Sequence, residues 1–142
     1  MKISARNAFQ GKVVQVKPGA VYSVVEFSTS GGARLVGTIT NESAQALGMV
    51  AGREAVAYVK ASSVLVMTDG TGMKLSARNC LPGHVSHVTD GPVSTAVSIV
   101  LAGGETVHAT ITHESSVDLG LKSGLPATAV FKASALIFAV PA

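Results

Sequence analysis

Two short polar motifs each occur twice in the chain, at a constant separation of 72 residues. Ser-Ala-Arg-Asn occupies residues 4–7 and 76–79, and Lys-Ala-Ser occupies residues 60–62 and 132–134. Together they supply hydroxyl groups, a guanidinium, a carboxamide and an ammonium, all of which donate hydrogen bonds. Removing water from a dianion is costly unless cations and oriented donors replace that water. Because no carboxylate is repeated beside either motif, the set favours a tetrahedral oxyanion over a metal cation as ligand.

The positive charge is unevenly distributed between the two halves. The chain has 11 Lys and Arg residues against 8 Asp and Glu, a net charge of +3. Residues 1–71 hold seven basic and four acidic residues, whereas residues 72–142 hold four of each. Only three basic positions occur in both halves: Lys2/Lys74, Arg6/Arg78 and Lys60/Lys132. A general nucleic-acid surface tolerates basic residues at shifted positions, so these fixed cations indicate a defined small site.

The motifs belong to a repeat that covers the whole chain. Paired glycines, a Thr-Ile-Thr segment and a Leu-Gly pair also recur at the offset of 72 without insertion or deletion. The repeat predicts two domains, residues 1–68 and 73–142, joined by a short linker at 69–72. Each unit has about 70 residues, which is near the lower limit for a self-sufficient hydrophobic core.

Apolar and β-branched residues predict five short strands in each copy. In the first copy these are residues 12–17, 21–27, 34–40, 54–60 and 63–67. Residues 41–47 are instead predicted to form a short helix, with Thr40 as N-cap and Gly48 just beyond its end. In the second copy the helix is residues 113–119, between Thr112 and Gly120. The predicted fold is mainly β: two tandem OB-like five-stranded barrels, each with one short helix between strands 3 and 4.

Several functional classes lack support in the sequence. No phosphate-binding loop, nucleophile elbow or zinc-protease motif occurs, so we expect a binding protein and not an enzyme, with no catalytic cofactor. His84 and His87 are three positions apart, which on a regular strand places them on opposite faces, so no metal-cation site is predicted. The single cysteine, Cys80, is read as a core residue. No apolar run is long enough to span a membrane, and the N-terminus lacks a signal-peptide pattern, so we expect a cytoplasmic protein without a membrane partner.

Two alternatives to anion binding remain open on residue types alone. The first is a pair of nucleic-acid-binding OB barrels, which the fold and the basic charge permit. Single-strand binders stack bases on aromatic side chains, whereas aromatic residues make up 4% of this chain and tryptophan is absent. The second alternative is a structural or regulatory interaction module without an anion ligand.

The combination of motifs resembles the molbindins, molybdate-binding proteins built from two Mop domains in tandem. The resemblance covers essentially the whole chain. It rests on the Ser-Ala-Arg-Asn motifs, the turns at 19–21 and 91–93, the Thr-x-Glu-Ser helix starts, and the Val-Lys-Ala-Ser and Phe-Lys-Ala-Ser segments at 59–62 and 131–134. It implies a cytoplasmic protein that stores and buffers molybdate or tungstate for molybdenum homeostasis. It also implies a trimer, with oxyanion sites between domains and between subunits. Because aromatic residues are scarce, we expect no nucleic-acid partner.

The resemblance also implies which residues bind the anion. The opening motif and the lysine segment of different domains are expected to meet around the ligand, with backbone N–H groups of the alanines contributing. The implied set is Ser4, Ala5, Arg6, Asn7, Lys60, Ala61, Ser62, Ser76, Ala77, Arg78, Asn79, Lys132, Ala133 and Ser134. A second kind of oxyanion site is implied at Gly19, Ala20, Val21, Gly91 and Val93. Pro92 stands where the first copy has Ala20 and has no N–H to donate, which predicts a weaker or differently lined second-copy site.

Overall fold

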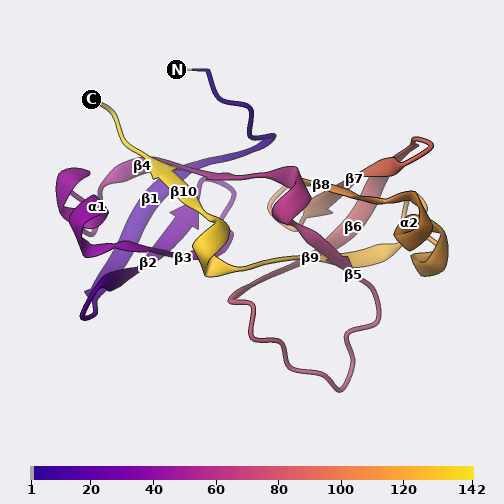
Figure 1. Ribbon diagram of the computed structural model, residues 1–142, viewed down its shortest axis with the longest axis horizontal. Coiled ribbons are helices and arrows are strands. Elements are labelled where there is room, and N and C mark those ends of the chain that lie inside the picture. The colour runs from indigo at the N-terminus through magenta and orange to yellow at the C-terminus, as the bar shows by residue number, and fades with distance from the viewer. Residues whose placement is uncertain (1) are drawn as a thin grey trace.

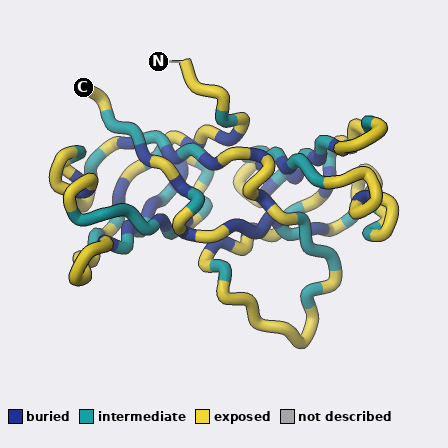
Figure 2. The backbone as a smooth tube through the Cα atoms, in the orientation of Figure 1, coloured by how far each residue is buried: buried dark blue, intermediate teal, exposed yellow. Residues whose placement is uncertain are grey.

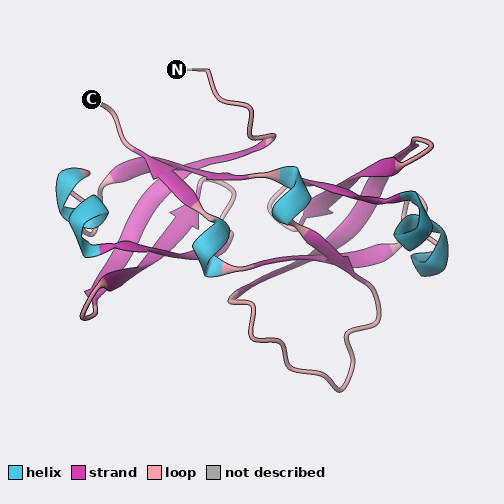
Figure 3. Ribbon diagram, viewed as in Figure 1, coloured by secondary structure: helices cyan, strands magenta, loops and turns pink. Residues whose placement is uncertain are grey.

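The protein, in a computed structural model that describes residues 2–142, consists mainly of β-strands (Figures 1 and 3). The first repeat contains β1 (Asn7–Pro18), β2 (Tyr22–Thr29), β3 (Arg34–Thr40), α1 (Asn41–Ala46), β4 (Glu54–Val59), the one-turn 3-10 helix η1 (Ala61–Ser63) and β5 (Leu65–Met67). The second contains β6 (Asn79–Asp90), β7 (Ser94–Leu101), β8 (Thr106–Thr112), α2 (His113–Leu119), β9 (Pro126–Phe131), the 3-10 helix η2 (Ala133–Ala135) and β10 (Ile137–Ala139). The predicted order of strands, with a helix between the third and fourth, is confirmed.

The strands form two five-stranded antiparallel sheets that do not follow the boundary between the repeats. Their orders are β10-β4-β1-β2-β3 and β5-β9-β6-β7-β8. Ile137 of β10 pairs with Tyr58 of β4, and Leu65 of β5 pairs with Val130 of β9. Figure 1 shows the yellow β10 lying against the first barrel and β5 against the second. The repeats therefore exchange their last strands, so neither barrel is built from residues 1–68 or 73–142 alone.

Alternating burial along the strands explains why these segments form sheets with one buried face. Val25 and Phe27 of β2 are fully buried, as are Val97 and Ile99 of β7, whereas the residues between them are half-buried. A period of two places the apolar side chains on the inner face of each sheet. Figure 2 shows the buried residues along the strands of both barrels, with the loop between β5 and β6 largely exposed.

The exchanged strand β10 contributes an aromatic residue to the first barrel. The Phe138 ring lies 5.6 Å from the Phe27 ring, centroid to centroid, with the planes tilted by 57°. The same ring covers Gly37 of β3, where a Cβ atom would collide with it. The equivalent positions in the other barrel hold Val66 and Ala109. The larger side chain of Phe138 in one barrel is thus matched by a glycine, and the smaller side chain of Val66 in the other barrel by an alanine.

Both α-helices begin and end as the sequence predicts. The side chains of Thr40 and Thr112 accept hydrogen bonds from the backbone N–H groups of Ser43 and Ser115, at 3.1 Å in each case. Gly48 and Gly120 adopt left-handed conformations, with φ of 63° and 61°, which end the helices without steric cost. The helices are short, and within residues 2–142 none is long and apolar enough to cross a membrane.

The hairpins that carry the paired glycines lie where the two barrels meet. Gly103 lies so close to the carbonyl oxygen of Gly31 that a Cβ atom at residue 103 would overlap it. Next to this contact, the Thr29 hydroxyl donates a hydrogen bond of 2.5 Å to the Glu105 carboxylate of the other repeat. The paired glycines therefore form turns and also allow close approach of the two barrels.

Candidate functional site

The strand register brings the two polar motifs of each repeat to the same end of one ladder. Asn7 of β1 pairs with Val59 of β4, and Asn79 of β6 pairs with Phe131 of β9. In an antiparallel pair the next positions outward also face each other. Arg6 directly precedes Asn7, and Lys60 directly follows Val59, so the two motifs of one repeat leave the ladder at the same end. That motifs of different domains meet around a ligand stays a prediction.

The asparagines of these motifs bind the backbone of the opposite barrel. Asn7 donates from Nδ2 to the carbonyl oxygen of His108 at 2.8 Å and accepts at Oδ1 from the His108 N–H at 2.7 Å. Asn79 makes the same two bonds to Val36, both at 2.8 Å. Each asparagine is 1% exposed. Because the side-chain oxygen and nitrogen are both engaged, these asparagines hold the motifs against the opposite barrel.

Each repeat thus carries a set of exposed donors that flank the outermost pair of its ladder. The helix η1, which follows Lys60, packs against β8, and η2, which follows Lys132, packs against β3. The side chains of one repeat are called the first donor cluster: Ser4, Arg6, Lys60 and Ser62. Those of the other repeat are called the second donor cluster: Ser76, Arg78, Lys132 and Ser134. All eight residues are exposed. Of the motif alanines, Ala61 and Ala133 are buried, and Ala5 and Ala77 are half-buried.

Among residues 2–142, the cations of the clusters have no acidic partner. The one salt bridge among residues 2–142 joins His113 to Asp90, with 3.7 Å between Nδ1 and Oδ1. Exposed Lys and Arg residues commonly lack partners, but these four recur at equivalent places beside hydroxyl groups. Their positive charge is therefore available to an external anion.

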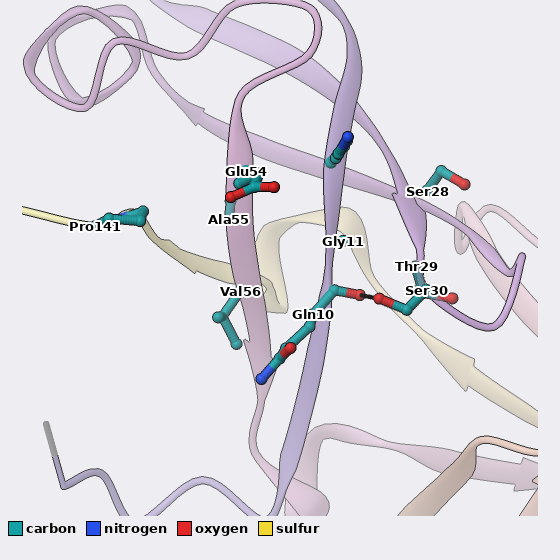
Figure 4. Close-up of a pocket in the computed structure, with 10 residues that line it drawn as sticks. Gln10, Gly11, Ser28, Thr29, Ser30, Glu54, Ala55, Val56 and Pro141 are labelled. Atoms are coloured by element: carbon teal, nitrogen blue, oxygen red, sulfur yellow. Dashed lines mark hydrogen bonds between the residues drawn. The ribbon is translucent and has the colours of Figure 1, made fainter.

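A hollow beside the C-terminal residues of the isolated chain does not contain the clusters. Figure 4 shows this pocket, which is open to solvent and lies on β1, β2 and β4 beside the C-terminal residues. The Glu54 carboxylate lies on its wall, and the Ser30 hydroxyl donates to the Gln10 carbonyl oxygen at 3.1 Å. The carboxylate makes this pocket unfavourable for a dianion. We therefore base the candidate site on the donor clusters.

The turns proposed as a second kind of oxyanion site differ between the repeats. The N–H groups of Gly19 and Gly91 are used within the turns, donating to Tyr22 at 2.7 Å and Ser94 at 2.9 Å. In the first repeat Asn41 donates to the Gly19 carbonyl oxygen at 2.9 Å. In the second repeat His113 replaces Asn41 and lies beside the Asp90 carboxylate. The second turn is thus lined by a carboxylate as well as by Pro92.

His84 and His87 do not lie on opposite faces of the sheet, contrary to the prediction from their spacing. A β-bulge interrupts β6 between Val85 and His87, so His84 pairs with Val100 and His87 with Ser98, two residues apart on one face. Both histidines are consequently exposed on the same side of the sheet. Among the described residues, no group of three His, Cys, Asp or Glu side chains is placed to hold a metal ion. The prediction that Cys80 is a core residue is wrong, because this cysteine is exposed.

His108 is the residue near the clusters that the sequence analysis did not identify. It lies on β8 with a half-buried side chain, and its Nδ1 is 3.0 Å from the Ser98 hydroxyl oxygen. Burial and, second, the positive charge of Arg6 lower the pKa of its imidazole below the usual 6.5. Since its counterpart in the first repeat is Val36, the repeat pattern carried no signal for it.

Comparison with known proteins places the chain in a family. A model of the TOBE domain matches twice, at residues 3–66 and 75–138. The molybdenum-pterin-binding protein MopA of Rhodobacter capsulatus is 42% identical over 141 residues, which is 99% of this chain and 53% of that protein. The molybdenum transport protein ModE of Herbaspirillum seropedicae is 41% identical over 140 residues, 99% of this chain and 52% of that protein. The chain thus spans about half the length of these curated relatives.

A solved structure matches the chain from end to end. It is a crystal structure of ModG, described as a cytoplasmic molybdate-binding protein, with molybdate bound. The TM-score is 0.96 at 48% sequence identity, covering 99% of this chain and 100% of that one. These matches confirm the resemblance to tandem Mop-domain proteins, and the chain belongs to the TOBE-domain family, with two copies of the domain in tandem.

Proposed function

We propose that this protein binds molybdate reversibly and serves to store and buffer the oxyanion in the cytoplasm. The observation that supports the proposal is the pair of donor clusters: Arg6, Lys60 and their equivalents are exposed, have serines nearby in the sequence, and have no acidic partner among residues 2–142. A fold that matches a molybdate-bound protein along its entire length supports the same ligand. Tungstate has the same charge and tetrahedral shape and is expected to bind as well. The role is binding, not catalysis.

Each part of the cluster has a distinct role in this proposal. Arg6 and Arg78 offer a planar fork of N–H groups, and Lys60 and Lys132 add a compact positive charge. Ser4, Ser62 and their equivalents donate neutral hydrogen bonds, as do backbone N–H groups of the motif alanines. Asn7 and Asn79 complete the predicted set and act by holding the motif in position, because their amide groups are already bonded to β8 and β3.

Self-association completes the sites in this proposal. The clusters are open in the isolated chain, and a second protein surface is needed to exclude water from the anion. Large apolar side chains are exposed at equivalent places in both repeats: Val21 and Val93 are 62% and 79% exposed, and Leu65 and Ile137 are each 60% exposed. Exposed apolar groups at repeated positions indicate an interaction surface. We propose that this surface forms a homotrimer, with further oxyanion sites at the turns that contain Gly19 and Gly91.

Isothermal titration calorimetry with molybdate tests the function and the residues together. The double variant Arg6→Ala/Lys60→Ala is expected to lose one class of sites, and Arg78→Ala/Lys132→Ala the other. Losing a charged hydrogen-bond partner commonly costs about 2 kcal/mol, or roughly thirtyfold in affinity. Lys12→Ala/Lys17→Ala removes the same charge from the exposed face of β1 and is the matched control. Equal weakening in all three double variants would show a general charge effect and refute the assigned site.

A further inference from the structure

The two donor clusters face chemically different residues of the opposite barrel. Asn7 fixes the first cluster to the backbone of His108, whereas Asn79 fixes the second to the backbone of Val36. Residues 36 and 108 are equivalent in the repeat. An ionisable imidazole therefore accompanies one cluster and an aliphatic side chain the other.

The His108 side chain lies on the outer face of β8, at the edge bound by the first cluster. Its neighbours along the strand, Val107 and Ala109, are buried inside the barrel, so residue 108 points outward. Nδ1 is engaged by the Ser98 hydroxyl, and the described residues offer no hydrogen-bond partner to Nε2. When the hydroxyl donates to Nδ1, the neutral ring carries its proton on Nε2, which is then a free donor.

We propose that His108 is a further recognition residue of the first donor cluster, which donates a hydrogen bond to the bound oxyanion and takes up a proton as the anion binds. The second cluster, with Val36 in that place, binds the anion without proton uptake. This inference rests on the proposed function and adds to it a difference between the two site classes.

The charges around His108 give the direction of the pH dependence. Arg6 faces it from the segment before β1, and Lys60 precedes η1, which packs against β8. On β7, Ser98 pairs with His108, and on β6, the next strand of the sheet, His87 pairs with Ser98. The acidic residues of α2, Glu114 and Asp118, follow the far end of β8, where Thr112 is about 13 Å along the strand. A protonated ring is therefore repelled by Arg6 until a dianion arrives.

Binding of a dianion reverses this balance. The negative charge favours the imidazolium, so the pKa of His108 is higher in the complex than in the free protein. By linkage, the affinity of the first site class increases as the pH falls through the interval between these two pKa values. The second site class has no such group and shows no such increase.

The test is calorimetric titration of molybdate between about pH 8 and about pH 6, in two buffers of different ionisation enthalpy. The Arg78→Ala/Lys132→Ala protein isolates the first site class. In it, binding heat is expected to depend on the buffer, which measures proton uptake, and affinity to rise toward low pH. Adding His108→Val, which copies the first repeat, should abolish the uptake and weaken binding near pH 6 about tenfold. The reciprocal Val36→His should introduce uptake at the second site class.

His87→Gln is the matched control, because it removes a histidine on the same face and copies Gln15 of the first repeat. It should leave the proton uptake unchanged. Molybdate binding with the same buffer dependence in His108→Val, or with none in the parent protein, would overturn the inference while leaving the proposed function intact. Absence of any molybdate binding by the unmodified protein would overturn both.

Discussion

The Asn7 side chain and the His108 backbone form a hydrogen-bonded pair that replaces a neighbouring strand at the edge of β8. The two bonds, of 2.8 and 2.7 Å, satisfy an N–H and a carbonyl group that β7 leaves free. A buried backbone group without a partner is costly. The motif that carries Arg6 is therefore fixed to the opposite barrel by the residue next to it.

Replacing Asn7 by Ala is expected to lower the free energy of unfolding by about 3 kcal/mol, because it leaves two buried backbone groups unpaired. Urea unfolding measures the change. Gln10→Ala, on the same strand and exposed, should change stability by less than about 0.5 kcal/mol. Similar values for the two variants would show that the pair contributes little.

The contact between glycine hairpins predicts a difference between two equivalent substitutions. At residue 103 a Cβ atom meets the carbonyl oxygen of Gly31, which belongs to the backbone and moves only with its barrel. At residue 31 it meets the Glu105 side chain, whose flexible end moves at lower cost. Gly103→Ala should therefore lower the free energy of unfolding more than Gly31→Ala does, by about 1 kcal/mol, the low end of the cost of overpacking, and should give the lower melting temperature. The opposite order in a calorimetric scan would contradict the interface described here.

Exchange of the last strands predicts that the halves depend on each other. Residues 1–72 lack the strand that completes the first sheet, and residues 73–142 lack the one that completes the second. Each half alone should be unstable as a monomer, and an equimolar mixture should restore a folded complex. Size-exclusion chromatography with circular dichroism tests this expectation. A half that stays monomeric and melts like the intact chain would show that it closes its barrel with its own strand.

His108 predicts loss of stability in mild acid. Because the pKa of its imidazole is lower in the folded protein than the unfolded value of 6.5, the unfolded chain binds the additional proton more readily. Above pH 6.5 the imidazole is neutral in both states, so its protonation does not affect the free energy of unfolding. This free energy falls as the pH drops from 6.5 through the lowered pKa. His108→Val should reduce the slope of melting temperature against pH in this range, relative to His87→Gln. An identical slope in both variants would exclude this contribution.

Molybdate should raise the melting temperature if the anion bridges groups that exist together only in the folded assembly. At 100 times the dissociation constant, a ligand of the native state adds about 2.7 kcal/mol to its stability. Differential scanning calorimetry with increasing molybdate measures the shift, and Arg6→Ala/Lys60→Ala should reduce it. An unchanged melting curve at saturating molybdate would argue against sites of this kind.

Local structure was well predicted from the sequence, because its signals are local. Thr40 and Thr112 cap helices, and Gly48 and Gly120 end them, through bonds and conformations that involve only near neighbours. The sequence pattern predicts that the first strand begins at residue 12, whereas β1 begins five residues earlier, at Asn7. Asn7 and Gln10 are polar and Gly11 is a weak strand former. Residues 7–11 therefore adopt a strand conformation only because they pair with β4.

The exchange of strands could not be predicted, for a physical reason. The last strands of the two copies have similar apolar patterns, so either is compatible with either barrel. Their choice depends on the path of the chain after Val59 and Phe131, which no pattern in the strands records. The same holds for His108, because its position beside Arg6 follows from contact between barrels and not from its place in a motif.

The packing of Phe138 over Gly37 also has a consequence for the evolution of the repeat. Phe138 belongs to the second copy, but the space that receives its ring is shaped by Gly37 and Phe27 of the first copy. The corresponding pair, Val66 and Ala109, again comes from both copies. Selection on barrel volume therefore acts on residues from the two halves of the gene together. Recombination that exchanged one copy for a homologue would mismatch two cores at once, which is a reason for such tandem genes to be inherited as one unit.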